Sequence, residues 1–153
     1  MQIYLACTVR GDRGAVAALR SLVAALERGG HTILTKHLLD DDVDTAEAAL
    51  SERAVYERDI AWLESCDLLI ADASGSSYGV GFEVGYVLGR SEHTDQRVVL
   101  LYRAERRDKI SRLVAGNHHP RCTVLKYEDP ADLIDRVLIH LQAGSSNPAF
   151  RKT

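Results

Sequence analysis

Residues 67–89 read DLLIADASGSSYGVGFEVGYVLG and contain the features that decide the fold. The first six, Asp67–Asp72, form a nearly continuous apolar run, as expected of a β-strand buried on both faces. A loop rich in glycine and serine follows, and Gly79–Arg90 is expected to form a helix. A buried strand that leads through such a loop into a helix is typical of parallel α/β sheets.

The same alternation of short apolar segments and longer amphipathic segments occupies the rest of the chain. We expect strands at Ile3–Cys7, Thr32–Leu34, Asp67–Asp72, Val98–Tyr102 and Cys122–Tyr127. We expect helices at Ala15–Arg28, Thr45–Ser65, Gly79–Arg90, Lys109–Ala115 and Pro130–Ala143. Five strands alternating with five helices predict an α/β fold with a doubly wound parallel sheet, in the flavodoxin-like (Rossmann-like) strand order 2-1-3-4-5.

Length and composition restrict the domain organisation and the partners. A chain of 153 residues has room for one domain, expected at 1–143, with a flexible polar tail at 144–153. A formal charge of −3 gives no general attraction for nucleic acid or an acidic membrane surface, so we expect a small-molecule partner. No basic leader or membrane-spanning run is evident, which predicts a cytoplasmic protein, or a nuclear one in a eukaryote.

The cysteine and histidine patterns do not indicate a metal or a cofactor. The three cysteines, Cys7, Cys66 and Cys122, lack CxxC spacing, and the six histidines form no HExxH motif. We therefore expect reduced cysteines in a chain that needs neither a metal nor another cofactor.

Parallel sheets bind ligands beyond the carboxyl ends of their strands, where the strand order reverses. This rule selects the loops at 8–14, 72–81 and 103–109. The backbone amides of the Gly/Ser loop could converge on an anion, although a plain turn with a capping serine would have the same composition. Its GxGxxxG spacing differs from the dinucleotide-binding motif, and no Gly-Lys-Ser/Thr ending indicates triphosphate binding.

Two carboxylates near these loops are candidates for chemistry. Glu83 is expected in the first turn of its helix, where the helix dipole would keep it ionised as a nucleophile at neutral pH. We expect Gly79, Gly81 and Gly85 to clear space on the side of that helix that faces the pocket. Asp59 is either an interhelical hydrogen-bonding residue or a second site acid. Two carboxylates on one sugar are the arrangement that glycosidic cleavage uses.

The loop after the first strand offers groups for binding phosphate. Arg10 could clamp a phosphate and Thr8 could donate its hydroxyl to the same group, although Arg10 could equally be a solvated surface residue. A lone histidine such as His37 is more often structural or a hydrogen-bond donor than a catalyst.

Three segments, IYLACTVRG (3–11), YERDIAWLESCDLLIADAS (56–74) and SYGVGFEVGYVLG (77–89), resemble the nucleoside 2-deoxyribosyltransferase superfamily in order and spacing. Within it the likeness is greatest to the 2′-deoxynucleoside 5′-phosphate N-hydrolases, and it extends from about residue 2 to residue 127. The resemblance implies hydrolysis of a deoxynucleoside 5′-monophosphate to free base and 2-deoxyribose 5-phosphate.

The resemblance also implies roles for individual residues. Glu83 matches the nucleophile that holds the deoxyribosyl group covalently, Asp59 the aspartate that assists the leaving base, and Tyr4 a tyrosine that orders the sugar and carboxylate. His37 matches a histidine near the base. The 5′-phosphate would be bound by the residues matching Thr8, Arg10, Gly11, Ser77, Gly79 and, from the neighbouring subunit of a homodimer with shared active sites, Ser111.

Two departures from the family pattern bear on the substrate. Cys7-Thr8 stands where the hydrolases read Gly-Ser, which affects the expected substrate preference more than the reaction. Ser76 and Ser77 stand where transferases of unphosphorylated nucleosides place an acid, and neutral hydroxyls accept a phosphate that a carboxylate would repel. Base exchange, a ribonucleotide substrate and a non-catalytic nucleotide-sensing module remain the alternatives.

Overall fold

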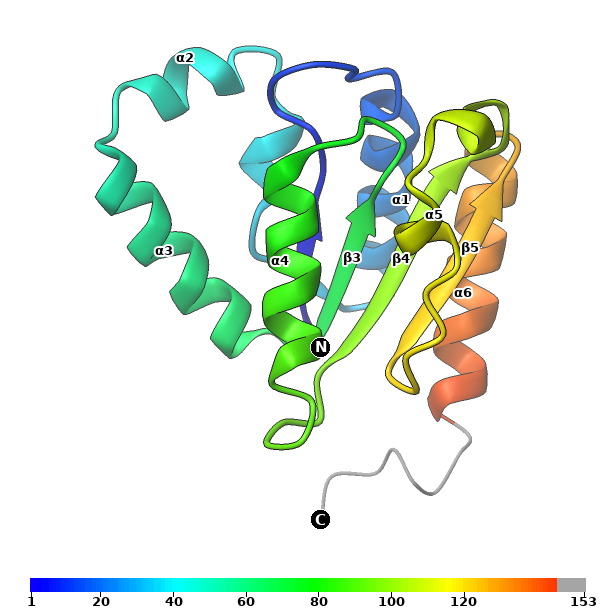
Figure 1. Ribbon diagram of the computed structural model, residues 1–153. Helices are drawn as coiled ribbons and strands as arrows, with labels where there is room; N and C mark the ends of the chain where they lie inside the picture. Colours follow the sequence, from blue (N-terminus) through cyan, green and yellow to red (C-terminus); the bar gives the residue numbers. More distant parts are fainter. Residues whose placement is uncertain (146–153) are drawn as a thin grey trace.

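The computed structural model describes residues 1–145 and contains one sheet of five strands in the order β2-β1-β3-β4-β5 (Figure 1). All four strand pairs are parallel. The strands are β1 (Gln2–Ala6), β2 (Thr32–Ile33), β3 (Leu68–Asp72), β4 (Arg97–Arg103) and β5 (Cys122–Tyr127). The predicted fold class and strand order are confirmed.

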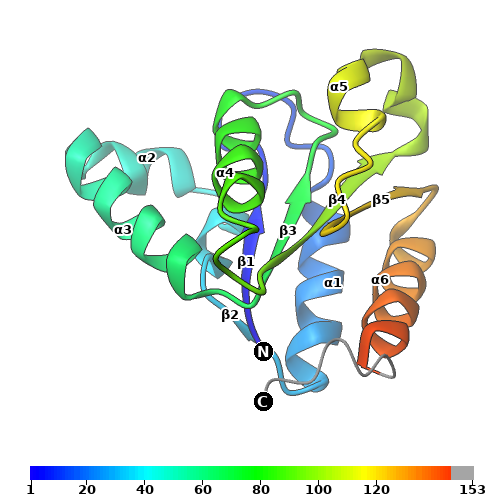
Figure 2. The same cartoon turned by 60° about the horizontal axis from the view of Figure 1, so that its bottom comes forward.

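Helices cover both faces of this sheet (Figures 1 and 2). The α-helices are α1 (Val16–Arg28), α2 (Val43–Ala48), α3 (Glu52–Ser65), α4 (Tyr78–Gly89), α5 (Arg112–Ala115) and α6 (Pro130–Ser145), and two 3-10 helices are η1 (Lys36–Leu39) and η2 (Ala104–Lys109). Apolar residues of α1 and α6 form one core with the sheet, and those of α3 and α4 form another on the opposite face. The structure thus has the three layers of a doubly wound fold.

The alternation of side chains along the strands decides which residues face which layer. On β1, Ile3 and Leu5 point into the core beneath α1, whereas Tyr4 and Ala6 belong to the core beneath α4. Tyr4 is fully buried and pairs in register with Leu69 of β3. The strand period therefore places a phenol directly beneath the helix that follows β3.

One predicted helix, Thr45–Ser65, is wrong as a single element, because α2 and α3 are separated at Ala49–Ser51. Ser51 begins the second helix, its side chain accepting a hydrogen bond from the Ala54 amide. Leu50, which the periodicity places on an apolar stripe, is 45% exposed, and Leu63 is the only buried residue of α3. Both helices stand away from the body of the sheet in Figures 1 and 2.

The short helix expected at Lys109–Ala115 is also shorter than predicted. Lys109 ends η2, and α5 covers only Arg112–Ala115, with Ser111 at its N-cap position. The predicted domain at 1–143 stays a prediction, and the predicted tail at 144–153 lies, from residue 146 onward, outside the described residues.

Candidate active site

The centre of the site is a hydrogen bond between β1 and α4. The Tyr4 hydroxyl donates to Glu83 Oε1 at 2.7 Å. Burial raises the pKa of the Tyr4 phenol far above its usual value, and the nearby Glu83 carboxylate adds to this shift. Tyr4 therefore keeps its proton and remains a donor to Glu83 throughout the physiological pH range.

Glu83 differs from the sequence-based expectation in position and in charge. Because α4 starts at Tyr78, Glu83 lies in the second turn, and α4 has no acidic residue in its first turn. The helix dipole acts mainly within the first turn. Burial raises the pKa of Glu83 to about 7, opposed by the hydrogen bond from Tyr4 and assisted by the charge of Asp59. The expectation of a fully ionised carboxylate at neutral pH is therefore wrong, because desolvation outweighs the dipole.

Asp59 comes to the same place from α3. Its charge raises the pKa of both Tyr4 and Glu83, which places the two carboxylates within electrostatic reach of each other. Asp59 Oδ1 accepts a hydrogen bond from Arg58 Nε at 2.8 Å. His37, from η1, lies beside Trp62 of α3, with ring centroids 5.6 Å apart, and its Nε2 is 3.3 Å from a Glu47 oxygen.

Most of the expected phosphate-binding residues lie in or next to the loops that follow β1 and β3, whereas Ser111 lies at the start of α5. Ser77 caps α4 by accepting a hydrogen bond from the Val80 amide at 3.4 Å, and Gly79 lies in the first turn. Gly11 has a φ of +125°, a conformation that favours glycine. Arg10 is exposed and its Nε donates to Asp44 at 2.8 Å. In this structure Arg10 is thus turned toward α2.

Thr8 is buried in the loop that follows β1. Its hydroxyl has no hydrogen-bond partner among the described residues. A Cβ added to Gly75 would lie 2.0 Å from Thr8 Oγ1 and 2.7 Å from the Asp12 carbonyl oxygen. The backbone of the loop after β3 therefore packs at Gly75 directly against Thr8 and Asp12 of the loop after β1. Only glycine leaves enough space for this contact.

We expect Gly75→Ala to destabilise the protein by about 1–3 kcal/mol, because the added methyl group overpacks a contact that includes a backbone oxygen. Thermal unfolding monitored by circular dichroism measures the change. Gly89→Ala is the matched control, since a Cβ at Gly89 would have no neighbour within 4 Å among the described residues outside its own helix backbone. Equal melting temperatures for the two variants would contradict this account of Gly75.

A second network that the sequence did not reveal fixes the Gly/Ser loop. The buried Asp72 carboxylate accepts hydrogen bonds from the Ser74 amide and hydroxyl and from the Tyr127 hydroxyl at 3.0–3.1 Å. Arg106 Nε donates to the Ser74 carbonyl oxygen at 3.2 Å, and Arg103 pairs with Asp12 at 2.8 Å. These contacts join the loops after β1, β3 and β4, which is where the strand order predicts a ligand.

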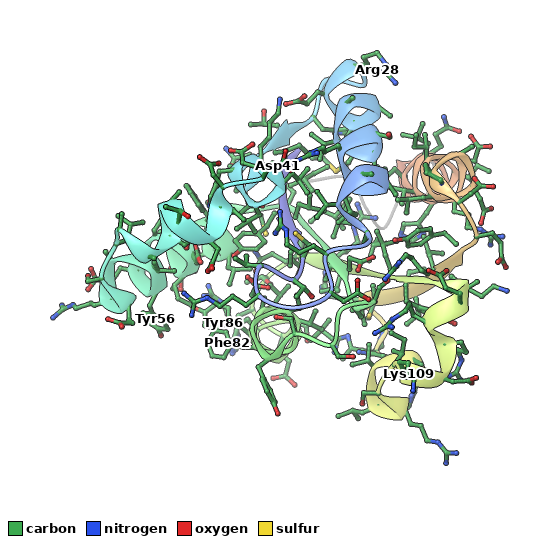
Figure 3. The ribbon with its side chains drawn as sticks, turned by 90° about the horizontal axis from the view of Figure 1, so that it is seen from above. Arg28, Asp41, Tyr56, Phe82, Tyr86 and Lys109 are labelled. Carbon is green, nitrogen blue, oxygen red and sulfur yellow. The ribbon has the colours of Figure 1, made fainter. Side chains whose placement is uncertain are left out.

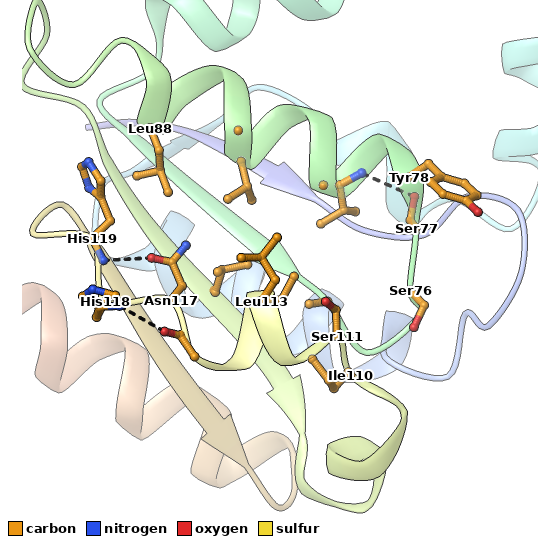
Figure 4. Close-up of a pocket in the computed structure, with 18 residues that line it drawn as sticks. Ser76, Ser77, Tyr78, Leu88, Ile110, Ser111, Leu113, Asn117, His118 and His119 are labelled. Carbon is orange, nitrogen blue, oxygen red and sulfur yellow. Dashed lines mark hydrogen bonds between the residues drawn. The ribbon is translucent and has the colours of Figure 1, made fainter.

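A groove of about 670 Å³ runs along the other side of α4, between that helix and α5 (Figure 4). It contains Ser77 and Ser111 but not Tyr4, Asp59 or Glu83. Gly81 and Gly85 line this groove, so the expectation that they clear space beside Glu83 is wrong. Glu83 lies on the side of α4 near α3, which carries Asp59, whereas the groove lies on the side of α4 near α5.

The described residues show no metal site and no membrane span. Residues 1–145 hold no group of three or more His, Cys, Asp or Glu side chains placed to bind a metal ion. No helix within the same range is long and apolar enough to cross a membrane.

The fold defines an α/β protein with a parallel sheet, and its candidate site brings together two carboxylates and a buried tyrosine. The chain belongs to the nucleoside 2-deoxyribosyltransferase family, whose sequence profile matches residues 3–133.

Three proteins similar to this chain are named as N-hydrolases or N-glycosidases of nucleotides. A Thermofilum pendens protein provisionally named 2′-deoxynucleoside 5′-phosphate N-hydrolase 1 is 39% identical over 90% of this chain and 92% of its own. The 5-hydroxymethyl-dUMP N-hydrolase of Danio rerio is 29% identical over 90% of this chain and 93% of its own. The structure of a Clostridium botulinum CMP N-glycosidase shares the fold, with a TM-score of 0.67 and 18% identity. The match covers 92% of this chain and 99% of the glycosidase chain.

Proposed function

We propose that this protein hydrolyses the N-glycosidic bond of 2′-deoxynucleoside 5′-monophosphates, releasing the free base and 2-deoxyribose 5-phosphate. The observation that carries the proposal is the Glu83 carboxylate, held by the buried Tyr4 hydroxyl and placed near Asp59. Two carboxylates on one sugar suit the cleavage of a glycosidic bond. The family and the names of the relatives support the nucleotide as substrate.

The reaction proceeds in two steps in this proposal. Glu83 Oε2 attacks C1′ while Tyr4 holds Oε1, and the C1′–N bond breaks with its electron pair leaving on the base. The departing base takes up a proton, and Asp59 assists this transfer. Water then attacks C1′ of the glutamyl ester and gives up a proton that replaces the one taken by the base, while the bond from C1′ to the Glu83 oxygen breaks. Glu83 returns as a carboxylate and the sugar phosphate is released. The 5′-phosphate is bound by Arg10 and the Gly/Ser loop.

Product analysis tests the proposal. We expect the chain to release free base from one or more of the four common deoxynucleoside monophosphates, or from a 5-substituted dUMP, detected by chromatography. Parallel reactions with ribonucleotides and with unphosphorylated deoxynucleosides define the sugar and phosphate requirements. A new nucleotide formed when a second base is added would identify base exchange instead. Binding without turnover of any substrate would identify a sensing module and overturn the proposal.

The raised pKa of Glu83 predicts the pH dependence. Attack requires the carboxylate, so kcat/KM should rise with pH through about 7, the pKa of this group in the folded protein. The titratable groups that act on Glu83 are Tyr4, whose own pKa lies far above this range, and Asp59 from α3. Initial rates at subsaturating substrate between pH 5 and 9 measure the profile. A flat profile above pH 5 would contradict a buried nucleophile.

We also propose a homodimer in which the groove of Figure 4 lies at the interface and Ser111 reaches the partner's phosphate site. Leu113 and Tyr78, at the groove, are 85% and 98% exposed, and Phe82 on α4 is 54% exposed (Figure 3). Four glycines occupy α4 at a cost of about 1 kcal/mol each relative to alanine. A Cβ added at Gly81 or Gly85, which line the groove, would have no neighbour within 4 Å among residues 1–145 beyond the backbone of α4 itself, which suits close approach by a second copy.

Ile110 and Val114, which flank Leu113, contribute little to this surface. Ile110 is 6% exposed within its own chain. Val114 is partly buried against the core under α4. The apolar surface that the groove offers to a partner therefore consists mainly of the exposed Leu113 side chain and the Tyr78 ring.

Complementation measures whether the site is shared. A Ser111→Ala chain and a Glu83→Gln chain should each form defective homodimers. Heterodimers of the two have one site with both lesions and one with neither, so activity should recover to as much as half that of wild type. Sedimentation of Leu113→Asp should show a shift toward monomer. A wild-type monomer at micromolar concentration, or no recovery after confirmed subunit exchange, would overturn the shared site.

A further inference from the structure

One guanidinium joins the candidate acid to a second carboxylate on another helix. Arg58 Nε donates to Asp59 Oδ1 at 2.8 Å, while Nη1 and Nη2 donate to the two oxygens of Glu47 at 2.9 and 3.1 Å. The three side chains are 15–26% exposed. A bidentate pair of this kind fixes the plane of the guanidinium, because both of its terminal nitrogens are held by one carboxylate.

The contact between the neighbouring residues Arg58 and Asp59 is not one that an isolated helix would favour. Adjacent residues of a helix point about 100° apart and do not normally face each other. Arg58 nevertheless contacts Asp59, because Glu47 of α2 holds its far end and the Trp62 ring lies under the guanidinium, with its centroid 5.0 Å from Cζ. The aspartate oxygen is thus fixed by an arginine that two other residues hold in place.

We propose that Arg58 is a positioning residue of the active site, which orients the Asp59 carboxylate toward the sugar and base through the Glu47–Arg58–Asp59 chain. The inference rests on the proposed function, since it assigns to Asp59 a contact with the substrate. With Oδ1 held by Arg58, Oδ2 remains to act on the nucleotide. Arginine suits this role better than lysine, because a single ammonium cannot hold both carboxylates in one plane.

Arg58 also balances charge around the nucleophile. The charge of Asp59 raises the pKa of both Tyr4 and Glu83, whereas that of Arg58 lowers the pKa of Tyr4. Contact with the Asp59 and Glu47 carboxylates raises the pKa of the guanidinium, although burial opposes the shift, so Arg58 remains a cation at every relevant pH. Arg58 thus offsets part of the Asp59 charge at the Tyr4 hydroxyl that holds Glu83, and without this cation the Asp59 carboxylate would lose the guanidinium that neutralises it at 2.8 Å. The acidic limb of the pH profile should then move upward.

The test compares Arg58→Gln with Asp59→Asn and with the double variant. We expect Arg58→Gln to lower kcat by about 10- to 100-fold, since a misplaced catalytic group costs on this order. In the Asp59→Asn background the same change should cost less than about twofold, because Arg58 acts through the carboxylate that is no longer present. The midpoint of the kcat/KM profile should rise in Arg58→Gln but not in the control.

Arg53→Gln is the matched control. Arg53 lies on the same helix and pairs with Glu57 at 2.7 Å, but its side chain is 85% exposed. The Arg53→Gln variant should retain the kcat and the pH profile of the wild-type chain. If Arg58→Gln fails to fold by circular dichroism, Arg58→Lys and Glu47→Gln take its place, and each should show the same loss to a smaller degree.

The outcomes separate this inference from the proposed function. A wild-type chain without turnover would overturn both. A wild-type chain that releases base, together with Arg58 variants that lose the same factor with and without the Asp59 carboxylate, would overturn the positioning role alone. A loss of kcat seen only in the double variant, or no loss of kcat in any Arg58 variant, would also overturn the positioning role.

Discussion

Glu83→Gln is expected to abolish release of the base while leaving affinity for the nucleotide roughly unchanged. The amide has nearly the shape of the carboxylate, and its oxygen can still accept a hydrogen bond from the Tyr4 hydroxyl, whose oxygen lies 2.7 Å from Glu83 Oε1 in the wild-type chain. It cannot form the ester with C1′, so kcat should fall by at least ~10³-fold, comparable with the loss of other catalytic nucleophiles. Single-turnover assays and nucleotide titration by calorimetry measure the two quantities.

The stability of the same variant shows whether a loss of activity reflects misfolding. The pKa of Glu83 in the folded protein is about 7, above its usual value of 4.5, so its contribution to stability is complete below pH 4.5 and is lost as the pH rises through 7. A neutral glutamine avoids burying this charge. Glu83→Gln should therefore melt at a higher temperature than wild type at pH 8, with a difference that shrinks toward pH 5.

Two results would contradict this account. A Gln variant with more than a tenth of wild-type turnover would exclude Glu83 as the covalent nucleophile. A variant that is less stable than wild type at pH 8 would show that the carboxylate is not the destabilising, desolvated group that its raised pKa indicates.

The fold could be predicted because its strands are continuous apolar runs. Leu68–Asp72 is buried at every position, a pattern that requires cover on both faces of the sheet and so indicates a doubly wound fold. The break between α2 and α3 could not be predicted in the same way. Leu50 looks like part of an apolar stripe, and its exposure depends on helices that stand away from the sheet.

The sequence allows the contact between Tyr4 and Glu83 to be anticipated, but not the electrostatics of the candidate site. The strand period and the helix after β3 bring the two side chains together, and the family resemblance singles out both residues. The pKa of Glu83 depends on desolvation by the surrounding protein, which local sequence does not contain. The helix dipole acts mainly within the first turn, and Glu83 is the sixth residue of α4, so burial decides its pKa.

Long-range polar contacts could not be predicted from the sequence. Arg58 and Glu47 are eleven residues apart on different helices, and Arg10 and Asp44 are thirty-four apart. Neither pairing has a periodicity or a motif. The only available signal for Arg58 was its position next to Asp59, which on a helix argues against contact.

Removal of the 5′-phosphate from the substrate should lower kcat/KM by ~10²–10⁴-fold. Two charge-assisted hydrogen bonds to the phosphate, from Arg10 and from the loop at Ser77, would contribute about 3–6 kcal/mol to transition-state binding. Arg10 must first leave Asp44, but this ion pair is 76% and 64% exposed, and pairs of this kind contribute about 0–1 kcal/mol. The phosphate dianion therefore competes for Arg10 at little cost.

Three variants locate the effect, each assayed with a deoxynucleotide and its matching deoxynucleoside. Arg10→Ala and, more mildly, Ser77→Ala should reduce the preference for the nucleotide, because each removes a donor to the phosphate. Arg28→Ala, an exposed arginine at the opposite end of α1 (Figure 3), should leave the preference unchanged. Equal kcat/KM for deoxynucleoside and deoxynucleotide in the wild-type chain would indicate a nucleoside transferase, since the serines at the loop would then bind a 5′-hydroxyl rather than a charge.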